Sequence, residues 1–306
     1  MKVKKQLLLG KIEATYGVDP VPTGATDAML VGNINISPLE MSAVERVAMR
    51  GFLGAAGRVI AGEHVKFGFE VEMFASGTAG TVTPYALAMK ACAHSETVVA
   101  LTSATYAPVD TAEQSATFYF NRDGKLRKIT GWRGSVKAKL SAKGIPMWNF
   151  DGIGLYSLAT DVALPVPTLT SWRAPLLVEA GVTTASLHGY SGLVSEFEMD
   201  GGATVVYRNL INGESVQFTG RNATASLTLE EPTMAQKDFE TILRAGTLGA
   251  LAVTHGTVAG NRVVFNAAAA QLVGYSESEQ DGIAMIKLDM ELIPASATTD
   301  YSIVFN

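Results

Sequence analysis

The sequence predicts a mainly β protein built from two tandem β-sandwich modules, each with a flanking α-helix. The first observation behind this prediction is a period of two in the placement of apolar residues. Four segments alternate apolar and polar residues in this way: 63–74, 136–143, 223–230 and 286–292. Such alternation is typical of antiparallel strands that place one face on a core.

Turn dipeptides support the same fold class. Asp123-Gly124 and Asn212-Gly213 each separate two strand-like segments, and such pairs favour two-residue hairpin turns. Gly260-Asn261 precedes another short apolar segment. We therefore expect hairpins at the first two dipeptides and the start of a strand after the third.

Two segments predict helices. Residues 84–93 follow Thr83, an expected N-cap, and begin with proline at the first helical position. Residues 233–245 end before Gly246 and place their larger apolar side chains on one face. One helix therefore falls in each half of the chain.

The helices also reveal an internal repeat. Residues 85–91 align with 239–245, with an aromatic residue at the start of each. Residues 134–146 align without gaps with 282–294, and both segments end in Ile-Pro. Because both offsets are close to half the chain length, the sequence predicts a tandem duplication.

The repeat sets the expected domain boundaries. A first module with an N-terminal arm covers 1–153, a linker covers 154–185, and a second module with a C-terminal arm covers 186–306. The linker contains Pro165, Pro167 and Pro175, and proline cannot donate to a sheet ladder. We expect this segment to run as an extended connector.

Composition narrows the class of protein. Hydrophobic residues make up 47% of the 306 residues, which excludes a disordered chain. No apolar run reaches the ~18 residues of a membrane-spanning helix, and 7–9 is too short a run for a signal peptide. The single cysteine, Cys92, excludes a disulfide framework. Charged residues make up only 17%, against about 25% in typical domains, which suggests surface buried against other subunits.

Charge is divided unequally between the halves. The net charge of −5 is the sum of +4 over residues 1–153 and −9 over the remainder. The basic excess lies in residues 122–143, which contain eight lysines and arginines and one aspartate. This stretch is either a nucleic-acid patch or a solvated strand face, and the overall acidity favours the strand face.

The sequence predicts no catalytic, cofactor or metal site. The four histidines are isolated from one another, and no spacing typical of a metal site is present. Gly-rich stretches such as 77–80 lack the flanking pattern of a phosphate loop. Paired carboxylates such as Glu196 and Glu198 fit a solvated acidic strand face better than an acid–base pair. Cys92 is expected to be a buried apolar residue.

A long irregular stretch, 37–62, interrupts the first module and carries both charged and apolar residues. Loops of this length inside a compact module are usually functional or make contacts. Its candidate contact residues are Glu45, Arg46, Arg50, Phe52, Leu53 and Arg58. A second candidate set lies on the basic strand: Lys137, Lys139 and Lys143.

Short stretches in the first 95 residues resemble the major tail tube proteins of long-tailed, siphovirus-like bacteriophages. They include 13–20, 30–31, 37–40, 44–46, 52–54, 69–73, 76–80 and the helix at 85–92. The resemblance implies a virion structural protein whose tail-tube-like β-sandwich modules form stacked rings around a lumen. Genomic DNA passes through that lumen into the host without specific binding.

The resemblance also implies partners and a symmetry. Single-module family members form hexameric rings, so a duplicated chain is expected to form trimeric rings of six modules. The ring stack would contact the tape-measure, tail terminator and distal tail proteins, would assemble in the host cytoplasm, and would need no membrane anchor. We expect the loop 37–62 and the basic arm 1–11 to join successive rings, and Lys137, Lys139 and Lys143 to join oppositely charged halves.

Two other classes remain open. A soluble β-sandwich binding module, such as an adhesin or carbohydrate-binding protein, would need an exposed aromatic platform, which Trp132, Trp148 and Trp172 would have to supply. An enzyme is the weaker alternative, because no convergent set of polar residues is visible.

Overall fold

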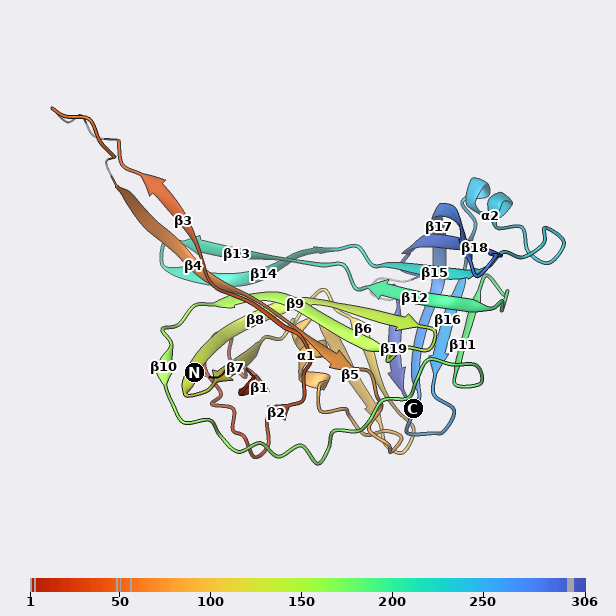
Figure 1. Ribbon diagram of the computed structural model, residues 1–306, viewed down its shortest axis with the longest axis horizontal. Helices are drawn as coiled ribbons and strands as arrows, with labels where there is room; N and C mark the ends of the chain where they lie inside the picture. The colour runs from red at the N-terminus through yellow and green to blue at the C-terminus, as the bar shows by residue number, and fades with distance from the viewer. Residues whose placement is uncertain (1, 3, 48, 50, 56, 296–299) are drawn as a thin grey trace.

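The computed structural model describes residues 2, 4–47, 49, 51–55, 57–295 and 300–306, and it is mainly β (Figure 1). The first half of the chain forms β1 (Gln6–Ile12), β2 (Ala28–Met29), β3 (Ile34–Glu45), β4 (Arg58–Glu72), α1 (Ala86–Ala91), β5 (His94–Val99), β6 (Ser103–Pro108), β7 (Ala116–Arg122), β8 (Lys125–Ser141) and β9 (Met147–Leu155). The second half forms β10 (Thr160–Asp161), β11 (Thr183–Leu187), β12 (Val194–Asp200), β13 (Ala203–Leu210), β14 (Gly213–Arg221), β15 (Thr224–Glu230), α2 (Phe239–Ala245), β16 (Leu248–His255), β17 (Val263–Gln280), β18 (Ile283–Leu292) and β19 (Ser302–Phe305).

The predicted hairpin at Asp123-Gly124 is confirmed. Arg122 pairs with Lys125, and the two turn residues have φ values of 39° and 95°, as a two-residue turn that continues the strand twist requires. The second hairpin is displaced by one residue. Leu210 pairs with Gly213, so the turn is made by Ile211 and Asn212, and Asn212 carries the positive φ of 78°.

Both helices form, but they are shorter than predicted. The helix α1 begins at Ala86, and its N-cap is Tyr85, without a side-chain cap, rather than Thr83. The helix α2 begins only at Phe239, because the Asp238 side chain caps it by accepting a hydrogen bond from the Thr241 N–H at 2.8 Å. Tyr85 and Phe239, the two aligned aromatic residues, are both buried.

The strands that matter most for function lie side by side in one extended antiparallel sheet. Its order is β3–β4–β9–β8–β12–β15–β18–β17, each strand paired with the next. The long strands β8 and β17 each leave this sheet and continue into a second layer, where β8 pairs with β7 and β17 pairs with β16. We call the first set of strands the main sheet.

The two halves repeat one succession of pairings, which is compatible with tandem modules. In the first half, β4–β9–β8–β7–β1 are paired in that order, and in the second half β15–β18–β17–β16–β11 are. By these pairings β18 corresponds to β9. The gap-free sequence alignment gives a different correspondence, because it aligns residues 282–294, which contain β18, with residues 134–146, which lie mostly in β8. Alternation alone cannot distinguish neighbouring strands, since every strand with one buried face shows it.

The core is continuous across the two halves. Trp148 of β9 is fully buried, and its ring centroid lies 5.5 Å from that of Phe265 in β17 and 6.5 Å from that of Phe305 in β19. Phe197 of β12 packs on Phe265 at 5.3 Å. These contacts join residues from both halves in one hydrophobic cluster.

The terminal segments belong to the body of the protein. An arm over residues 1–11 was the expectation, but Gln6–Ile12 forms β1, which pairs with β7 along its whole length and buries Leu8 completely. The expected C-terminal arm contains β19, which lies between β17 and β6 and so links the two halves. Apolar side chains on both segments make burial more favourable than exposure.

We expect the folded protein to lose stability in mild acid, because the side chain of His94 is buried. Its Nδ1 donates to the Cys92 carbonyl at 2.8 Å, and its Nε2 accepts from the Tyr301 hydroxyl at 2.7 Å. Burial lowers the pKa of His94 from 6.5 to about 4. The neutral ring therefore contributes stability that is complete above pH 6.5 and is lost as the pH falls through about 4, a contribution of about 3 kcal/mol.

Urea unfolding between pH 7 and pH 4 tests this expectation. The midpoint should fall steeply with pH in the wild type and less steeply in His94→Gln. A residual slope is expected in His94→Gln, since burial also lowers the pKa of His188 and of His255. Equal slopes in wild type and His94→Gln would contradict the assignment.

Candidate assembly surfaces

The two halves meet edge to edge where β8 pairs with β12. Residues 137–141 of β8 pair with 196–200 of β12, and the two edges carry opposite charges. Lys137 Nζ lies 2.8 Å from Asp200 Oδ2. Lys139 Nζ lies 2.8 Å from Glu196 Oε1 and 2.6 Å from Glu198 Oε1. We call this pairing the internal joint.

The charges at the internal joint hold one another in the ionised state. The hydrogen bond with Glu196 raises the pKa of Lys139, and the hydrogen bond with Asp200 raises the pKa of Lys137. The hydrogen bond from Lys139 likewise lowers the pKa of Glu196. Because these side chains are partly exposed, their chief effect is to fix the register of the two strands, with a modest gain in stability.

Lys143 does not take part in this arrangement. It lies in the turn after β8 with a positive φ of 63°, and its backbone N–H donates to the Val178 carbonyl at 2.7 Å. Its side chain is exposed. The structure therefore brings together two of the three lysines that the sequence singled out, and their role between copies of the chain stays a prediction.

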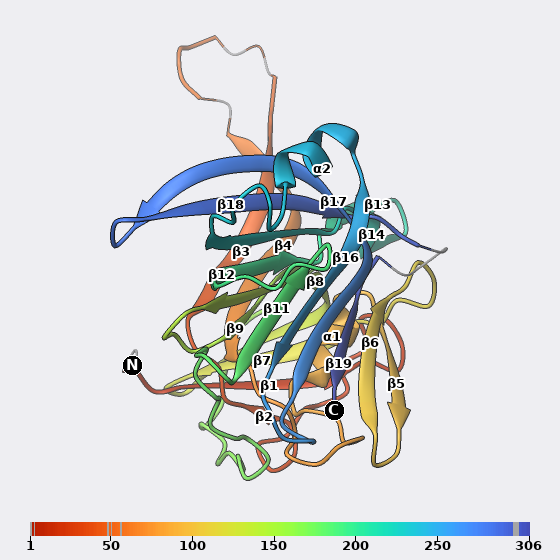
Figure 2. The ribbon, with the colours of Figure 1, turned by 90° about the vertical axis from the view of Figure 1, so that its right-hand side faces the viewer.

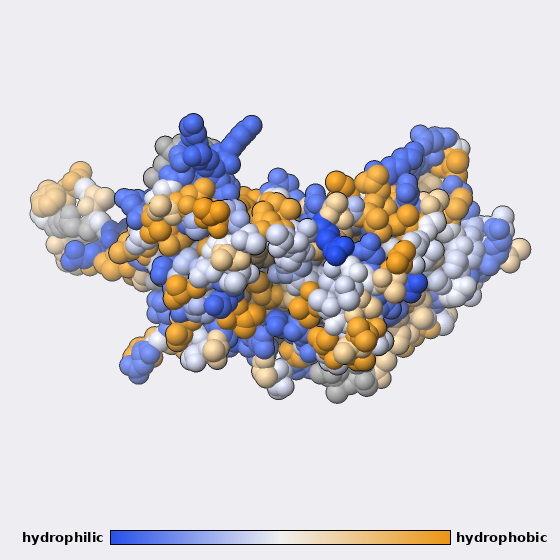
Figure 3. All heavy atoms as spheres, turned by 90° about the horizontal axis from the view of Figure 1, so that it is seen from below, coloured by the Kyte–Doolittle hydropathy of each residue, from blue (hydrophilic) through white to orange (hydrophobic). Residues whose placement is uncertain are grey.

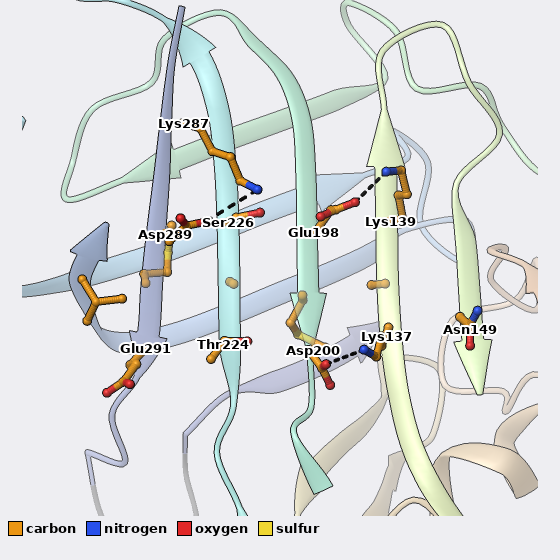
Figure 4. Close-up of a pocket in the computed structure, with 15 residues that line it drawn as sticks. Lys137, Lys139, Asn149, Glu198, Asp200, Thr224, Ser226, Lys287, Asp289 and Glu291 are labelled. Atoms are coloured by element: carbon orange, nitrogen blue, oxygen red, sulfur yellow. Dashed lines mark hydrogen bonds and ion pairs between the residues drawn. The ribbon is translucent and has the colours of Figure 1, made fainter. Parts of the chain in front are cut away.

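The face of the main sheet that carries these lysines is polar across β9, β8, β12, β15 and β18 (Figure 4), and it continues onto β4. It surrounds a hollow of about 550 Å³. Each lysine on this face has a carboxylate oxygen within 4.0 Å: Lys66, Lys137, Lys139 and Lys287. Carboxylates outnumber the lysines on this face. Besides the partners of these lysines, it carries Glu70, Glu72, Asp151 and Glu291. We call this surface the polar face.

The expected irregular loop 37–62 is mostly a β-hairpin. β3 and β4 remain paired as far as Glu45 and Arg58, so only 46–57 connect them. Glu45 and Arg58, two of the predicted contact residues, form an ion pair at 2.6 Å across the end of the hairpin. We call β3, β4 and their connection the arm, because it projects away from the body (Figures 1 and 2).

The end of the arm exposes apolar side chains, as the projecting end in Figure 3 shows. Phe52 is 71% exposed and Leu53 is fully exposed. Arg46 lies at the base of the connection, where its N–H donates to the Gly57 carbonyl at 3.4 Å. Arg50, the remaining predicted contact residue, lies outside the described residues. Exposed apolar clusters of this kind mark contact surfaces.

The residues that the alternative functions would use are buried or half-buried. Trp132 and Trp148 are fully buried, and Trp172 is half-buried against the core, so the three do not form an exposed platform. Cys92 is buried, and burial raises the pKa of its thiol. The described residues contain no cluster of metal-ligating side chains, and none of their helices is long and apolar enough to span a membrane.

A second projecting element was not identified from the sequence. β17 and β18 form a long hairpin that extends beyond β12 and β15 (Figure 2). Its turn is Asp281-Gly282, with φ values of 57° and 80°. This is the same kind of turn signal as Asp123-Gly124, so the dipeptide itself would have predicted the hairpin.

Comparison with known families identifies the class of protein. A model of the phage tail tube protein family matches residues 4–293. The chain therefore belongs to the phage tail tube protein family, a family of structural proteins of the virion tail and not of enzymes. A search of curated proteins finds no match.

Proposed function

We propose that this protein is the major tail tube subunit of a long-tailed bacteriophage and that it self-assembles into stacked rings. The tube is the conduit through which the genome is ejected into the host. The observation that carries the proposal is the internal joint, in which two halves with the same succession of pairings continue one sheet. A joint that links two modules inside the chain is a pattern that further copies can extend around a ring.

The ring we propose is a trimer with pseudo-sixfold symmetry, as the resemblance of a duplicated chain to hexameric, single-module tail tube proteins implies. Each chain supplies modules at 1–153 and 186–306, joined by the linker at 154–185, so three chains give a ring of six modules. Closing a sheet into a ring also removes exposed strand edges, which an antiparallel protein must otherwise protect.

The polar face is the surface that we assign to the lumen. DNA phosphates are attracted by free lysines, and each lysine on this face is already paired with a carboxylate. The excess of carboxylates repels phosphate further. Such a lining lets DNA pass without binding.

The end of the arm is the surface that we assign to contacts between successive rings. It projects farthest from the body, and it carries Phe52 and Leu53 together with the Glu45–Arg58 ion pair. At the two ends of the tube, the same surfaces would meet the tape-measure, tail terminator and distal tail proteins. Assembly would take place in the host cytoplasm before the tail joins the virion.

Negative-stain electron microscopy of the purified protein tests the proposal directly. Rings or tubes with a central channel are expected, and class averages with threefold or sixfold symmetry would support the trimer. A protein that stays monomeric at all concentrations and salt conditions would contradict the proposed function.

The lumen assignment predicts that freeing Lys139 makes the tube retain DNA. Replacing Glu196 and Glu198 by glutamine removes both carboxylates that hold Lys139 Nζ. Binding of duplex DNA to the assembled protein should then strengthen several-fold at low salt, and the gain should disappear as salt rises. Fluorescence anisotropy of labelled DNA measures this effect.

A matched control changes the charge without freeing a lysine. Replacing Glu230 and Glu291 by glutamine alters the net charge equally, and neither carboxylate lies in an ion pair among the described residues. This control loses some repulsion of phosphate but frees no lysine, so it should bind DNA more weakly than the Glu196 and Glu198 double variant. Equal binding by both double variants would show that net charge, and not the pairing of Lys139, governs DNA passage.

A further inference from the structure

The main sheet ends in two edges that no described strand covers. At one end, β3 pairs with β4 and with no other described strand. At the other end, β17 pairs with both β16 and β18 at Ala270 and Gln271, but beyond these residues it pairs only with β18. No described strand therefore pairs with the β16 side of β17 from Leu272 to Gln280, and we call this side the open edge of β17. The helix α2, which precedes β16, also contacts β17.

The internal joint shows what covers an edge of this kind. β8 corresponds to β17 in the repeated succession of pairings, and it likewise pairs first with β7 and then with β9. Past the end of β7, the side of β8 opposite β9 is covered by residues 196–200 of β12. This is the same side that is open on β17.

The strand β12 has its own counterpart in the first half. In the second half, β12 pairs with β15, and β15 corresponds to β4 of the first half. The strand that pairs with β4 on the equivalent side is β3, so β3 is the counterpart of β12. In the internal joint the outer edge of β12 lies against β8. The outer edge of β3, its equivalent, is open.

We propose that the open edge of β17 in one copy pairs with the open edge of β3 in the next copy, as β8 pairs with β12 inside the chain. This inference rests on the proposed function and names the surfaces that join copies within a ring. The two edges lie at opposite ends of the main sheet, so they belong to different copies when they meet. A contact between two different surfaces is heterologous, and such contacts close into rings.

The backbone of β17 is suited to this pairing. The two-residue turn at Asp281-Gly282 makes Gln280 and Ile283 a hydrogen-bonded pair, and such pairs alternate along a hairpin. By this alternation, the peptide groups of Glu277 and Glu279 point away from β18 and toward the open side. An incoming strand would satisfy them.

The β13–β14 hairpin of the second half indicates how the arm is placed in the ring. After Asp200, the chain continues into the β13–β14 hairpin, which lies across β8 and β9. The guanidinium of Arg133 in β8 lies 5.5 Å from the Phe218 ring centroid of β14 and donates to the Val216 carbonyl at 3.0 Å. The arm continues from β3 in the same way, so its base is placed to lie across β17 and β18 of the neighbouring copy.

Two sets of variants test the joint. Glu277→Pro removes an outward N–H of β17 and keeps the pairing with β18, because proline is tolerated on a free edge. It should convert rings to monomers in analytical ultracentrifugation, whereas Glu277→Gln, which keeps the N–H, should assemble as the wild type does. Unchanged near-ultraviolet circular dichroism checks that Glu277→Pro is folded.

Crosslinking tests the same joint without disturbing the backbone. Ser276→Cys on β17 and Ser42→Cys on β3, which the antiparallel register of the internal joint places near each other, are combined in one chain. Native Cys92 is buried and does not compete. A flexible bismaleimide should then link copies into covalent dimers and trimers. The matched control replaces Ser276→Cys by Ser226→Cys, which lies on the interior strand β15, and should give no linked copies.

The outcomes separate this inference from the proposed function. A wild type that forms no rings contradicts the proposed function. Wild-type rings together with normal rings of Glu277→Pro, or with equal crosslinking of the control, overturn the β17–β3 joint and leave the proposed function standing. Loss of rings in Glu277→Pro and selective crosslinking through Ser276→Cys support the joint.

Discussion

Trp148→Ala is expected to lower the stability of both halves of the chain in a single transition. The side chain is fully buried on β9, and it packs on Phe265 and Phe305, which belong to the second half. Its Nε1 donates to the Tyr85 hydroxyl at 3.3 Å. Truncation of a buried aromatic residue of this size costs about 3–5 kcal/mol, through lost burial and the cavity that remains.

Differential scanning calorimetry of the unassembled protein measures the effect. A chain of this length should show a fall in Tm of roughly 5–10 °C for such a loss, with one peak before and after the substitution. Trp172→Ala is the matched control: this tryptophan is only half-buried, so its fall in Tm should be smaller. Two separate peaks, of which only one moves, would contradict a shared core.

The shared core was not predictable from local patterns. Alternation at residues 63–74 and 223–230 shows which side chains face a core, but it does not show that both strands face the same one. Duplicated modules suggest separate cores, whereas β19 inserts between β17 and β6 and joins them. Contacts of this kind depend on pairings between residues far apart in the chain.

The arm shows why part of the candidate site was misread. Residues 37–62 lack clean alternation, and the structure places register shifts between Ser37 and Glu40 and between Glu40 and Ser42. A bulge adds a residue to one strand and breaks the period of two. For this reason the sequence predicts an irregular loop where the structure has two paired strands, and the contact role of its residues stays a prediction.

The internal joint itself was not predicted from the sequence. The lysines of β8 stand out in the sequence as a basic run, but their partners on β12 are 59 residues away in the case of Lys139 and Glu198. Acidic residues 196–200 look like any solvated strand face. The pairing of β8 with β12 is needed to see that the basic and the acidic side chains are partners.

Shortening the end of the arm is expected to abolish tubes while leaving rings intact. Residues 46–57 can be replaced by Asn-Gly, because Glu45 and Arg58 already pair across the hairpin and a two-residue turn can close it. The change removes the exposed side chains of Phe52 and Leu53. Burial of each such side chain in a contact contributes about 1.5–3 kcal/mol, and a ring of three chains loses this contribution three times over.

Electron microscopy and sedimentation distinguish the two levels of assembly. The shortened protein should sediment as single rings, because the edges of β3 and β17 and the internal joint are unchanged. Ile211→Ser, at the exposed turn of the β13–β14 hairpin, is the control that removes an apolar side chain from the other hairpin, and it should still form tubes. Tubes of normal length from the shortened protein would show that ring stacking depends on another surface. Loss of rings as well as tubes would show that the end of the arm contributes to contacts within a ring.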